Sequence, residues 1–493
     1  MKKFVAGMLS FCMMATLIAG CNGGETTPTT AAPTAAPAQT EGGDGGETDA
    51  PETEAPSGDK IVINLWSFTD EVPKMIDAYM ESHPDFAAQY EVVPTIIATT
   101  NGEYQPALDQ ALINGGDDAP DFYCCEAAFI ARYTQGEMGE YACPYSELGI
   151  DVAAETSAAN IAQYTMDIGS NTSGELVALG YQATGGAMIY RRSIATEVFG
   201  TDDPDEIANV VGAGSGNWDA FYDAAAQLHD AGYATVSSIG DLWNVVKNAP
   251  GTQGWVTDDD TLYLDPNRES FLDLAKDFLD NDWCNDTSAW GDAWFADMAD
   301  ASDRQVFCFF GPAWLINYTI APHCGSYDES GENLIGSYAD GLGTYGDWAC
   351  CPSPVGFFWG GTWVLANVNS DKKEAVGELI RWITLDCSES GLQYAWANGL
   401  MNAAGTGDCV ASGTVMDISD GSTDFLGGQN MFDVFVPANA LASGESFQPL
   451  DEDINTFWQD QVSLYAHGEK DRDTAIADFF TNVEENLEIA PAE

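Results

Sequence analysis

Residues 61–80 read IVINLWSFTDEVPKMIDAYM, and this stretch decides the fold class. Its first six residues are apolar apart from Asn64, which predicts a buried β-strand. The apolar residues that follow have the spacing of one helix face: Val72, Met75, Ile76 and Tyr79. A strand followed at once by an amphipathic helix is the repeating unit of α/β folds.

The same alternation continues toward the C-terminus. We predict strands at 90–95 and 121–125, a helix at 106–114 and another helix from about residue 127. Strands that alternate with helices indicate a parallel sheet with helices on both faces, in an α/β fold. In such sheets ligands bind beyond the carboxyl ends of the strands, here at residues 66–68 and 125–126.

The rest of the chain is too long for a single hydrophobic core and predicts a second lobe. A new region opens near residue 181. Further elements are expected as helices at about 217–231, 269–280, 371–385, 454–466 and 474–487, and as strands within 306–310 and 357–368.

The N-terminus has the pattern of a secretory signal. Lys2 and Lys3 precede an apolar run too short to span a bilayer, and Leu17-Ile18-Ala19-Gly20-Cys21 resembles a bacterial lipobox. In that motif the signal is cut before the cysteine, whose thiol receives a diacylglycerol anchor. We therefore predict a signal over 1–21, with acyl chains such as palmitate on Cys21.

Residues 22–59 are rich in Thr, Pro, Ala, Gly and Glu. This composition cannot bury enough apolar surface to form a core, so we predict a disordered tether. A flexible chain of this length spans roughly 35 Å. It would keep a globular body near the membrane while letting it turn.

The charge balance excludes several classes of partner. The chain has 78 acidic and 16 basic side chains, a formal net charge of −62. Such a surface repels nucleic acid, heparin-like chains and anionic lipid. A neutral or cationic ligand is favoured.

No motif predicts catalysis, a metal or a cofactor. Cys-x-x-Cys, Walker and Gly-x-Ser-x-Gly sequences do not occur, and the four histidines are scattered. Residues 341–346 match a dinucleotide-type glycine pattern, but no apolar strand precedes it, which indicates a loop. The cysteines after Cys21 lie in apolar runs, so we expect mostly buried thiols, with one or two disulfides left open.

Tryptophan is the residue type that suggests a ligand. Flat aromatic rings suit the apolar faces of sugars, and carboxylates and amides suit the hydroxyls. Candidates at predicted strand ends or beside glycine are Trp66, Trp243, Trp290, Trp294, Trp314, Trp359 and Trp363. Those within helical patterns are interpreted as core: Trp382, Trp396 and Trp458.

Six blocks in order resemble the extracellular sugar-binding proteins of bacterial ABC importers. They are IVINLWSFTD (61–70), YQATGGAMIYRRSIATEVFGTDDPDE (181–206), VFCFFGPAWLINYTIAP (306–322), FFWGGTWVLANVNSDKKEAVGELIRWIT (357–384), GGQNMFDVFVPAN (427–439) and HGEKDRDTAIADFF (467–480). The resemblance implies the class II periplasmic-binding-protein fold, with two α/β lobes joined by several hinge crossings. It places one lobe at 60–180 and 364–428, and the other at 181–363 and 429–493.

The resemblance also implies a set of ligand-binding residues. They are Trp66, Asp70, Glu71, Glu126, Gln182, Asp241, Trp243, Trp314, Trp359, Trp363, Gln429 and Asn430. Trp66, Trp314 and Trp363 are the stacking candidates among them.

The function implied is binding of a mono- to oligosaccharide for delivery to an ABC permease, without catalysis. The resemblance, with the lipobox and tether, implies a monomeric lipoprotein anchored at the extracellular face of a Gram-positive type of membrane.

Three alternatives stay open at this point. One is a binding protein for another polar solute, such as a peptide or polyamine. The second is a surface glycoside hydrolase, because acidic pairs are too common here to exclude one by counting. The third is a cell-surface adhesin, which should show no closing cleft.

The lipid anchor is tested by replacing Cys21. Cys21→Ala should leave the protein unprocessed or release it into the medium, because the acceptor thiol is lost. Cell fractionation and gel mobility measure the outcome. Full membrane retention with normal mobility would contradict the lipobox.

Overall fold

The computed structural model describes residues 60–99, 102–327, 334–401 and 405–492. The predicted signal, Cys21 and the tether lie outside these residues. No helix in the described part is long and apolar enough to span a bilayer.

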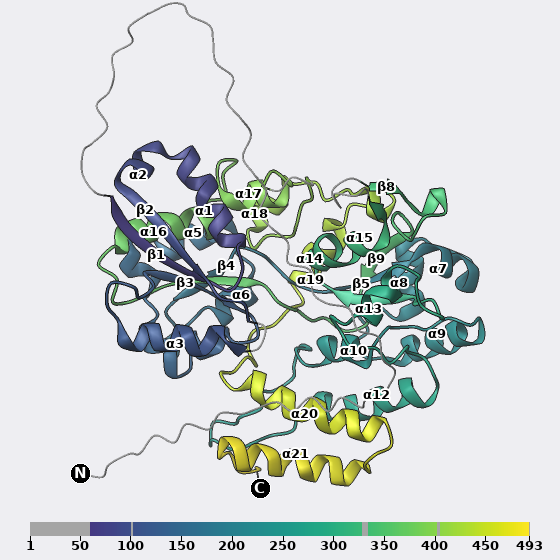
Figure 1. The fold of residues 1–493 in the computed structure, drawn as a ribbon. Helices are drawn as coiled ribbons and strands as arrows, with labels where there is room; N and C mark the ends of the chain where they lie inside the picture. Colours follow the sequence, from purple (N-terminus) through teal and green to yellow (C-terminus); the bar gives the residue numbers. More distant parts are fainter. Residues whose placement is uncertain (1–59, 100–101, 328–333, 402–404, 493) are drawn as a thin grey trace, which may run out of the picture. The chain divides into compact units, whose positions relative to one another are not determined.

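The first sheet has five strands in the order β2-β1-β3-β10-β4 (Figure 1). The strands are β1 (Ile61–Ser67), β2 (Tyr90–Ile96), β3 (Phe122–Glu126), β4 (Ala178–Gly180) and β10 (Thr362–Ala366). β1 pairs in parallel with β2 and β3, as predicted, whereas β10 is antiparallel to β3 and β4. The sheet is therefore mixed: β10 arrives from the other half of the chain and enters in the opposite direction.

Helices cover both faces of this sheet, as the alternating pattern predicts. On one face, α1 (Glu71–Ser82) and α16 (Lys373–Thr384) bury their apolar residues with Ile63 and Leu65 of β1. On the other face, α3 (Tyr104–Asn114) and α4 (Ile130–Thr134) pack with Tyr123 of β3. Alternate residues of each strand thus enter different cores.

The second sheet is antiparallel, in the order β6-β5-β9. Its strands are β5 (Ala187–Arg191), β6 (Cys308–Gly311) and β9 (Trp348–Pro352). One face packs on a core formed with α9 (Asp219–Asp230), α10 (Ile239–Val246), α12 (Phe271–Asp280), α20 (Asp451–Ala466) and α21 (Arg472–Leu487). α20 and α21 lie side by side (Figure 1).

Two segments connect the sheets and are hydrogen-bonded to each other. Gly186 N donates to Phe357 O at 2.9 Å, and Trp359 N donates to Thr184 O at 3.1 Å. A Cβ on Gly186 would lie 2.0 Å from the Phe357 ring, so this close approach requires glycine. The predicted boundary at 363/364 falls inside β10, which lies wholly in the first sheet; the other lobe limits stay a prediction.

The ten cysteines of the described residues are all free, and nine are buried. The expectation of mostly buried thiols is confirmed, and neither of the disulfides left open forms among them. Burial raises the pKa of Cys124 to about 12. Such a thiol carries little of the reactive thiolate.

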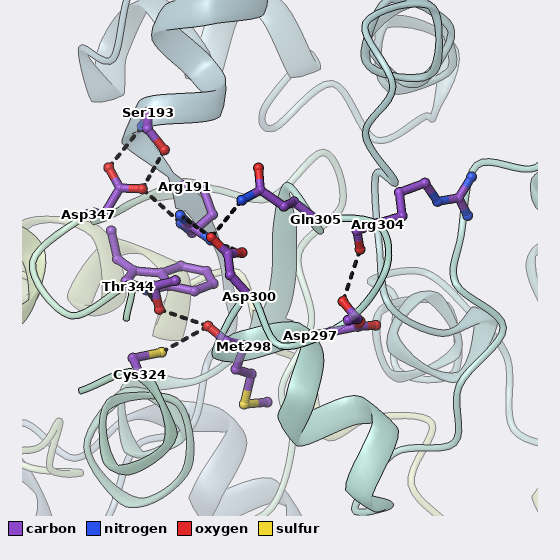
Figure 2. A network of polar contacts seen from close by, with 12 residues as sticks. Arg191, Ser193, Asp297, Met298, Asp300, Arg304, Gln305, Cys324, Thr344 and Asp347 are labelled. Atoms are coloured by element: carbon purple, nitrogen blue, oxygen red, sulfur yellow. Dashed lines mark hydrogen bonds and ion pairs between the residues drawn. The ribbon is translucent and has the colours of Figure 1, made fainter. Parts of the chain in front are cut away.

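A buried arginine organises the end of β5 (Figure 2). Arg191 Nε donates to Asp347 Oδ2 at 2.8 Å, and its Nη1 donates to Asp300 Oδ1 at 2.5 Å. Asp347 also accepts from the Ser193 backbone N–H at 2.9 Å, and Asp300 accepts from Gln305 at 2.8 Å. The side chain of Arg191 is 1% exposed, and it forms an ion pair with each of the two carboxylates. Its loss would leave both of them without this cation.

Arg191→Met tests this network. The substitution keeps the apolar length but leaves two carboxylates without their cation, which should lower the free energy of unfolding by about 3–5 kcal/mol. Urea denaturation measures the loss. The matched control is Lys276→Ala, which breaks the more exposed pair with Asp280 and should cost less than about 0.5 kcal/mol. Equal losses in the two variants would show that the network does not stabilise the fold.

Candidate ligand-binding site

A pocket of about 830 Å³ lies at the carboxyl ends of β1 and β3. Its lining includes Phe68 to Glu71 after β1, Glu126 at the end of β3, and Trp359 to Thr362 where the chain returns to the first sheet. This is the edge that the parallel arrangement of β1 and β3 predicts for a ligand. Asp70, Glu71, Glu126, Gln182, Trp314 and Trp359 all line it, so the structure brings together six of the twelve predicted site residues.

Three tryptophans form one wall of this pocket. The rings of Trp290 and Trp314 are nearly parallel, with an interplanar angle of 7° and centroids 6.3 Å apart. Trp359 is tilted against both, with centroid distances of 5.9 and 5.1 Å. Trp290 is 53% exposed, although a large apolar ring is normally covered. An exposed ring beside two others offers a flat surface to a ligand.

Local backbone positions these rings. Trp314 follows β6 and Pro312 in the short helix α14 (Ala313–Leu315), and its indole N–H donates to Trp359 O at 3.2 Å. A Cβ on Gly360, whose φ is +71°, would lie 3.1 Å from the Trp314 ring. Glycine at position 360 therefore allows the left-handed backbone conformation and leaves room for the Trp314 indole.

A second aromatic pair completes the pocket. Tyr318 and Trp396 are stacked with centroids 6.3 Å apart, and both line the cavity. The helical pattern around Trp396 predicts a core residue; the residue is 6% exposed but borders the pocket as well. Tyr318 was missed, and its spacing of four residues from Trp314 is the sequence signal that could have found it.

The carboxyl groups of Glu71 and Asp408 lie near each other beside α1, and Glu71 lines the pocket. Tyr181 donates its hydroxyl proton to Glu71 Oε1. Burial, with the nearby Asp408 and Asp70 carboxyls, raises the pKa of Glu71 to about 8, and Lys74 opposes the rise. Asp408 is buried and accepts from Gln182 Nε2 at 2.9 Å and Trp396 Nε1 at 3.3 Å. Burial raises the pKa of Asp408 to about 6; no sequence motif marked this residue.

Glu126 stands at the junction with a smaller cavity of about 180 Å³. Its Oε2 accepts from the Ala128 backbone N–H at 2.8 Å. Burial raises the pKa of Glu126 to about 7, and Lys247 opposes the rise. Trp243 and Lys247 line only the smaller cavity, so of the predicted residues Trp243 is adjacent to the main pocket and not in its lining.

Two of the three predicted stacking residues do not line the pocket. Trp66 and Trp363 lie within strands, and their side chains point to the face covered by α3. Trp363 is fully buried and donates its indole N–H to Thr165 O at 3.2 Å. Strand alternation turns both rings away from the pocket: Trp363 lies in the core, and Trp66 is partly buried against it. Trp314 alone remains from that set.

The remaining three predicted residues make hydrogen bonds within the fold and do not line the pocket. Asp241 is buried in the first turn of α10, where it accepts from the backbone N–H of the N-cap residue Ser238 at 3.0 Å and from Trp294 Nε1 at 3.0 Å. Gln429 makes both amide hydrogen bonds to the Cys350 backbone, at 3.0 and 2.8 Å. Asn430 accepts from the backbone of Gly421 at 3.0 Å. The structure does not place these three in the lining of either cavity.

The raised pKa of Glu71 predicts how stability depends on pH. The folded state binds this proton more tightly than the unfolded chain, whose carboxyl has a pKa near 4.5. This contribution is fully present below about pH 4.5 and is lost as the pH rises to about 8, by up to about 1.4 kcal/mol per pH unit.

Glu71→Gln should flatten the fall in unfolding free energy across this range, because the amide cannot ionise and can still accept from Tyr181. Urea denaturation at a series of pH values measures it. Glu81→Gln, at an exposed position on the same helix, is the control. An unchanged slope in Glu71→Gln would show that Glu71 titrates like an ordinary carboxyl.

Sequence comparison identifies no relative: no family model matches the chain, and no curated protein matches it. Solved structures do match. An extracellular solute-binding protein of family 1 superposes with a TM-score of 0.67 at 15% identity, covering 86% of this chain and 99% of its own.

Two further structures cover 88% of this chain and 100% of their own. One is the galacto-N-biose/lacto-N-biose I-binding protein of an ABC transporter from Bifidobacterium longum, with a TM-score of 0.61 at 15% identity. The other is the GacH receptor of Streptomyces glaucescens, with a TM-score of 0.59 at 16% identity. The chain thus has the two-lobed α/β fold of extracellular solute-binding proteins.

Proposed function

We propose that this protein binds a carbohydrate, from a mono- to an oligosaccharide, and delivers it to an ABC import permease. The observation that carries the proposal is the wall of Trp290, Trp314 and Trp359 in the main pocket. Sugar rings present apolar C–H faces that pack on flat aromatic rings.

The polar groups of the pocket suit the remaining surface of a sugar. Glu71, Glu126 and Gln182 line the same cavity and offer acceptors and an amide to hydroxyl groups. The volume of about 830 Å³ is within the range of pockets that enclose small ligands. Six of the nineteen lining residues are aromatic and eight are polar or charged, a mixture that suits both the apolar faces and the hydroxyl groups of a sugar.

The solved relatives in fold support the ligand class. The Bifidobacterium protein was solved with lacto-N-biose and the Streptomyces receptor with acarbose. A further match, from Thermotoga lettingae, was solved with tagatose, at 14% identity and a TM-score of 0.58.

Binding is proposed to close the two lobes over the ligand. The pocket has lining from the first sheet, through Glu71 and Glu126, and from the segment after β6, through Trp314 and Tyr318. A ligand that contacts both sides stabilises whichever arrangement gives it more contacts. Closure, with no chemical step, would then signal to the permease.

Location and partners belong to the same proposal. A lipid on Cys21 and the 22–59 tether would keep the monomeric protein at the extracellular face of the membrane, beside its permease. Asp70 and Glu126 would then be ligand contacts and not the acid pair of a hydrolase.

The ligand class is tested with a panel of neutral sugars. Sugars that bind should raise the melting temperature and change tryptophan fluorescence, and should be recovered intact. Trp290→Ala and Trp314→Ala should each weaken binding by about 1–3 kcal/mol, on the scale measured when an aromatic ring loses a stacked ring partner. Isothermal titration measures the affinity.

Tyr338→Ala is the control, because Tyr338 is 44% exposed and does not line the main pocket. Wild-type affinity in both tryptophan variants would refute this site. Release of reducing ends during incubation would instead support a hydrolase.

A further inference from the structure

Among the residues that the structure describes, three carboxyl groups in or behind the lining of the main pocket form no ion pair. Glu71 and Glu126 line it, and Asp408 lies behind Gln182 and Trp396. Across residues 60–99, 102–327, 334–401 and 405–492, no Lys, Arg or His nitrogen is within 4.0 Å of their oxygens. Asp408 is buried, and Glu71 and Glu126 are partly buried at the pocket surface. Carboxyl groups removed from water seldom lack a cation, since their charged form loses its hydration.

The basic side chains nearest the pocket do not form ion pairs with these carboxyl groups. Lys74 borders the pocket, but its ammonium is 2.6 Å from Asp70 Oδ2 and its side chain is 71% exposed. Lys247 and Glu126 both line the smaller cavity, and the ammonium attracts the carboxylate, but the two groups form no ion pair within 4.0 Å. The Lys247 ammonium instead donates to Asn244 Oδ1 at 3.0 Å. Glu452 also faces Glu126 and adds negative charge.

The aromatic lining suits a cation as well as a sugar face. Trp290, Trp314 and Trp359 have centroids within 6.3 Å of one another, and Tyr318 and Trp396 form a second stacked pair. An ammonium within about 6 Å of an indole face is attracted by the ring quadrupole. Rings and carboxylates around one cavity are the combination that recognises organic ammonium groups.

We infer that the preferred ligand is a saccharide that carries a protonated amine, which the pocket recognises through Glu71, Glu126 and the tryptophan wall. This inference rests on the proposed function and narrows its ligand class. The net charge of −62 acts in the same direction, because it concentrates cations near the surface.

Proton release distinguishes this ligand from a neutral sugar. Burial raises the pKa of Glu71 to about 8 and that of Glu126 to about 7, so both carboxyls are largely protonated at slightly acidic pH in the empty pocket. An ammonium beside them favours the ionised form and lowers these pKa values. Amine binding should therefore release protons and strengthen as the pH rises, until the amine itself deprotonates.

The test uses two disaccharides that differ only in charge: β-1,4-linked glucosamine disaccharide and its di-N-acetyl counterpart. Isothermal titration at about pH 6.5, where an amine is protonated, is run in two buffers of different ionisation enthalpy. The free amine should bind at least tenfold more tightly and release protons to the buffer. Added salt should reduce its preference.

Variants locate the effect. Glu71→Gln and Glu126→Gln should each reduce about tenfold the ratio of the affinity for the free amine to the affinity for the acetylated disaccharide, because the amide keeps an acceptor for hydroxyl groups but cannot carry the charge. Glu81→Gln, exposed on α1 and away from the pocket lining, should change neither. If one glutamine variant fails to fold, the other carries the same comparison.

The outcomes separate this inference from the proposed function. Equal affinity for the pair, or tighter binding of the acetylated sugar, overturns the amine preference and leaves carbohydrate binding in place. Binding of another neutral sugar from the panel, with neither disaccharide bound, does the same. Failure of every sugar overturns the proposed function itself.

Discussion

The geometry of the site depends on the contact between the two crossing segments. Thr184 and Gly186 exchange backbone hydrogen bonds with Phe357 and Trp359, and the Phe357 ring fills the space where a side chain at position 186 would lie. This contact fixes where Trp359 stands, and Trp359 in turn receives the Trp314 indole. Residues from the segments next to both sheets therefore meet in one wall of the pocket.

The first strands and helices could be predicted from local sequence patterns, because burial on one face directly sets the spacing of apolar residues. Apolar runs and helical spacing located β1, α1, β2, α3 and β3 to within a few residues of their observed limits. The direction of β10 was not readable, since strand polarity depends on which half of the chain returns to the sheet. Long-range pairing leaves no mark in a short window of sequence.

The site was predicted in part, for a related reason. Position at a strand end identified Glu126, and the family resemblance supplied Glu71. Trp66 and Trp363 lie inside strands, where alternation decides the face and turns both rings toward the α3 side. Trp290 comes from an irregular segment, and its position beside glycine marks it as a ligand candidate in the sequence. Asp408 comes from another irregular segment, and no sequence pattern marks it. Asp408 gains its role only from neighbours far away in the chain, such as Gln182.

The buried thiols have a consequence for how the molecule opens. Nine of the ten described cysteines are covered, from both sheets and from the segments between them, while Cys387 is partly accessible. A thiol-modifying reagent should reach Cys387 first and each of the others only when its own surroundings unfold. The chain thus carries its own set of local reporters, and the order in which they react would map which parts of the two lobes loosen first.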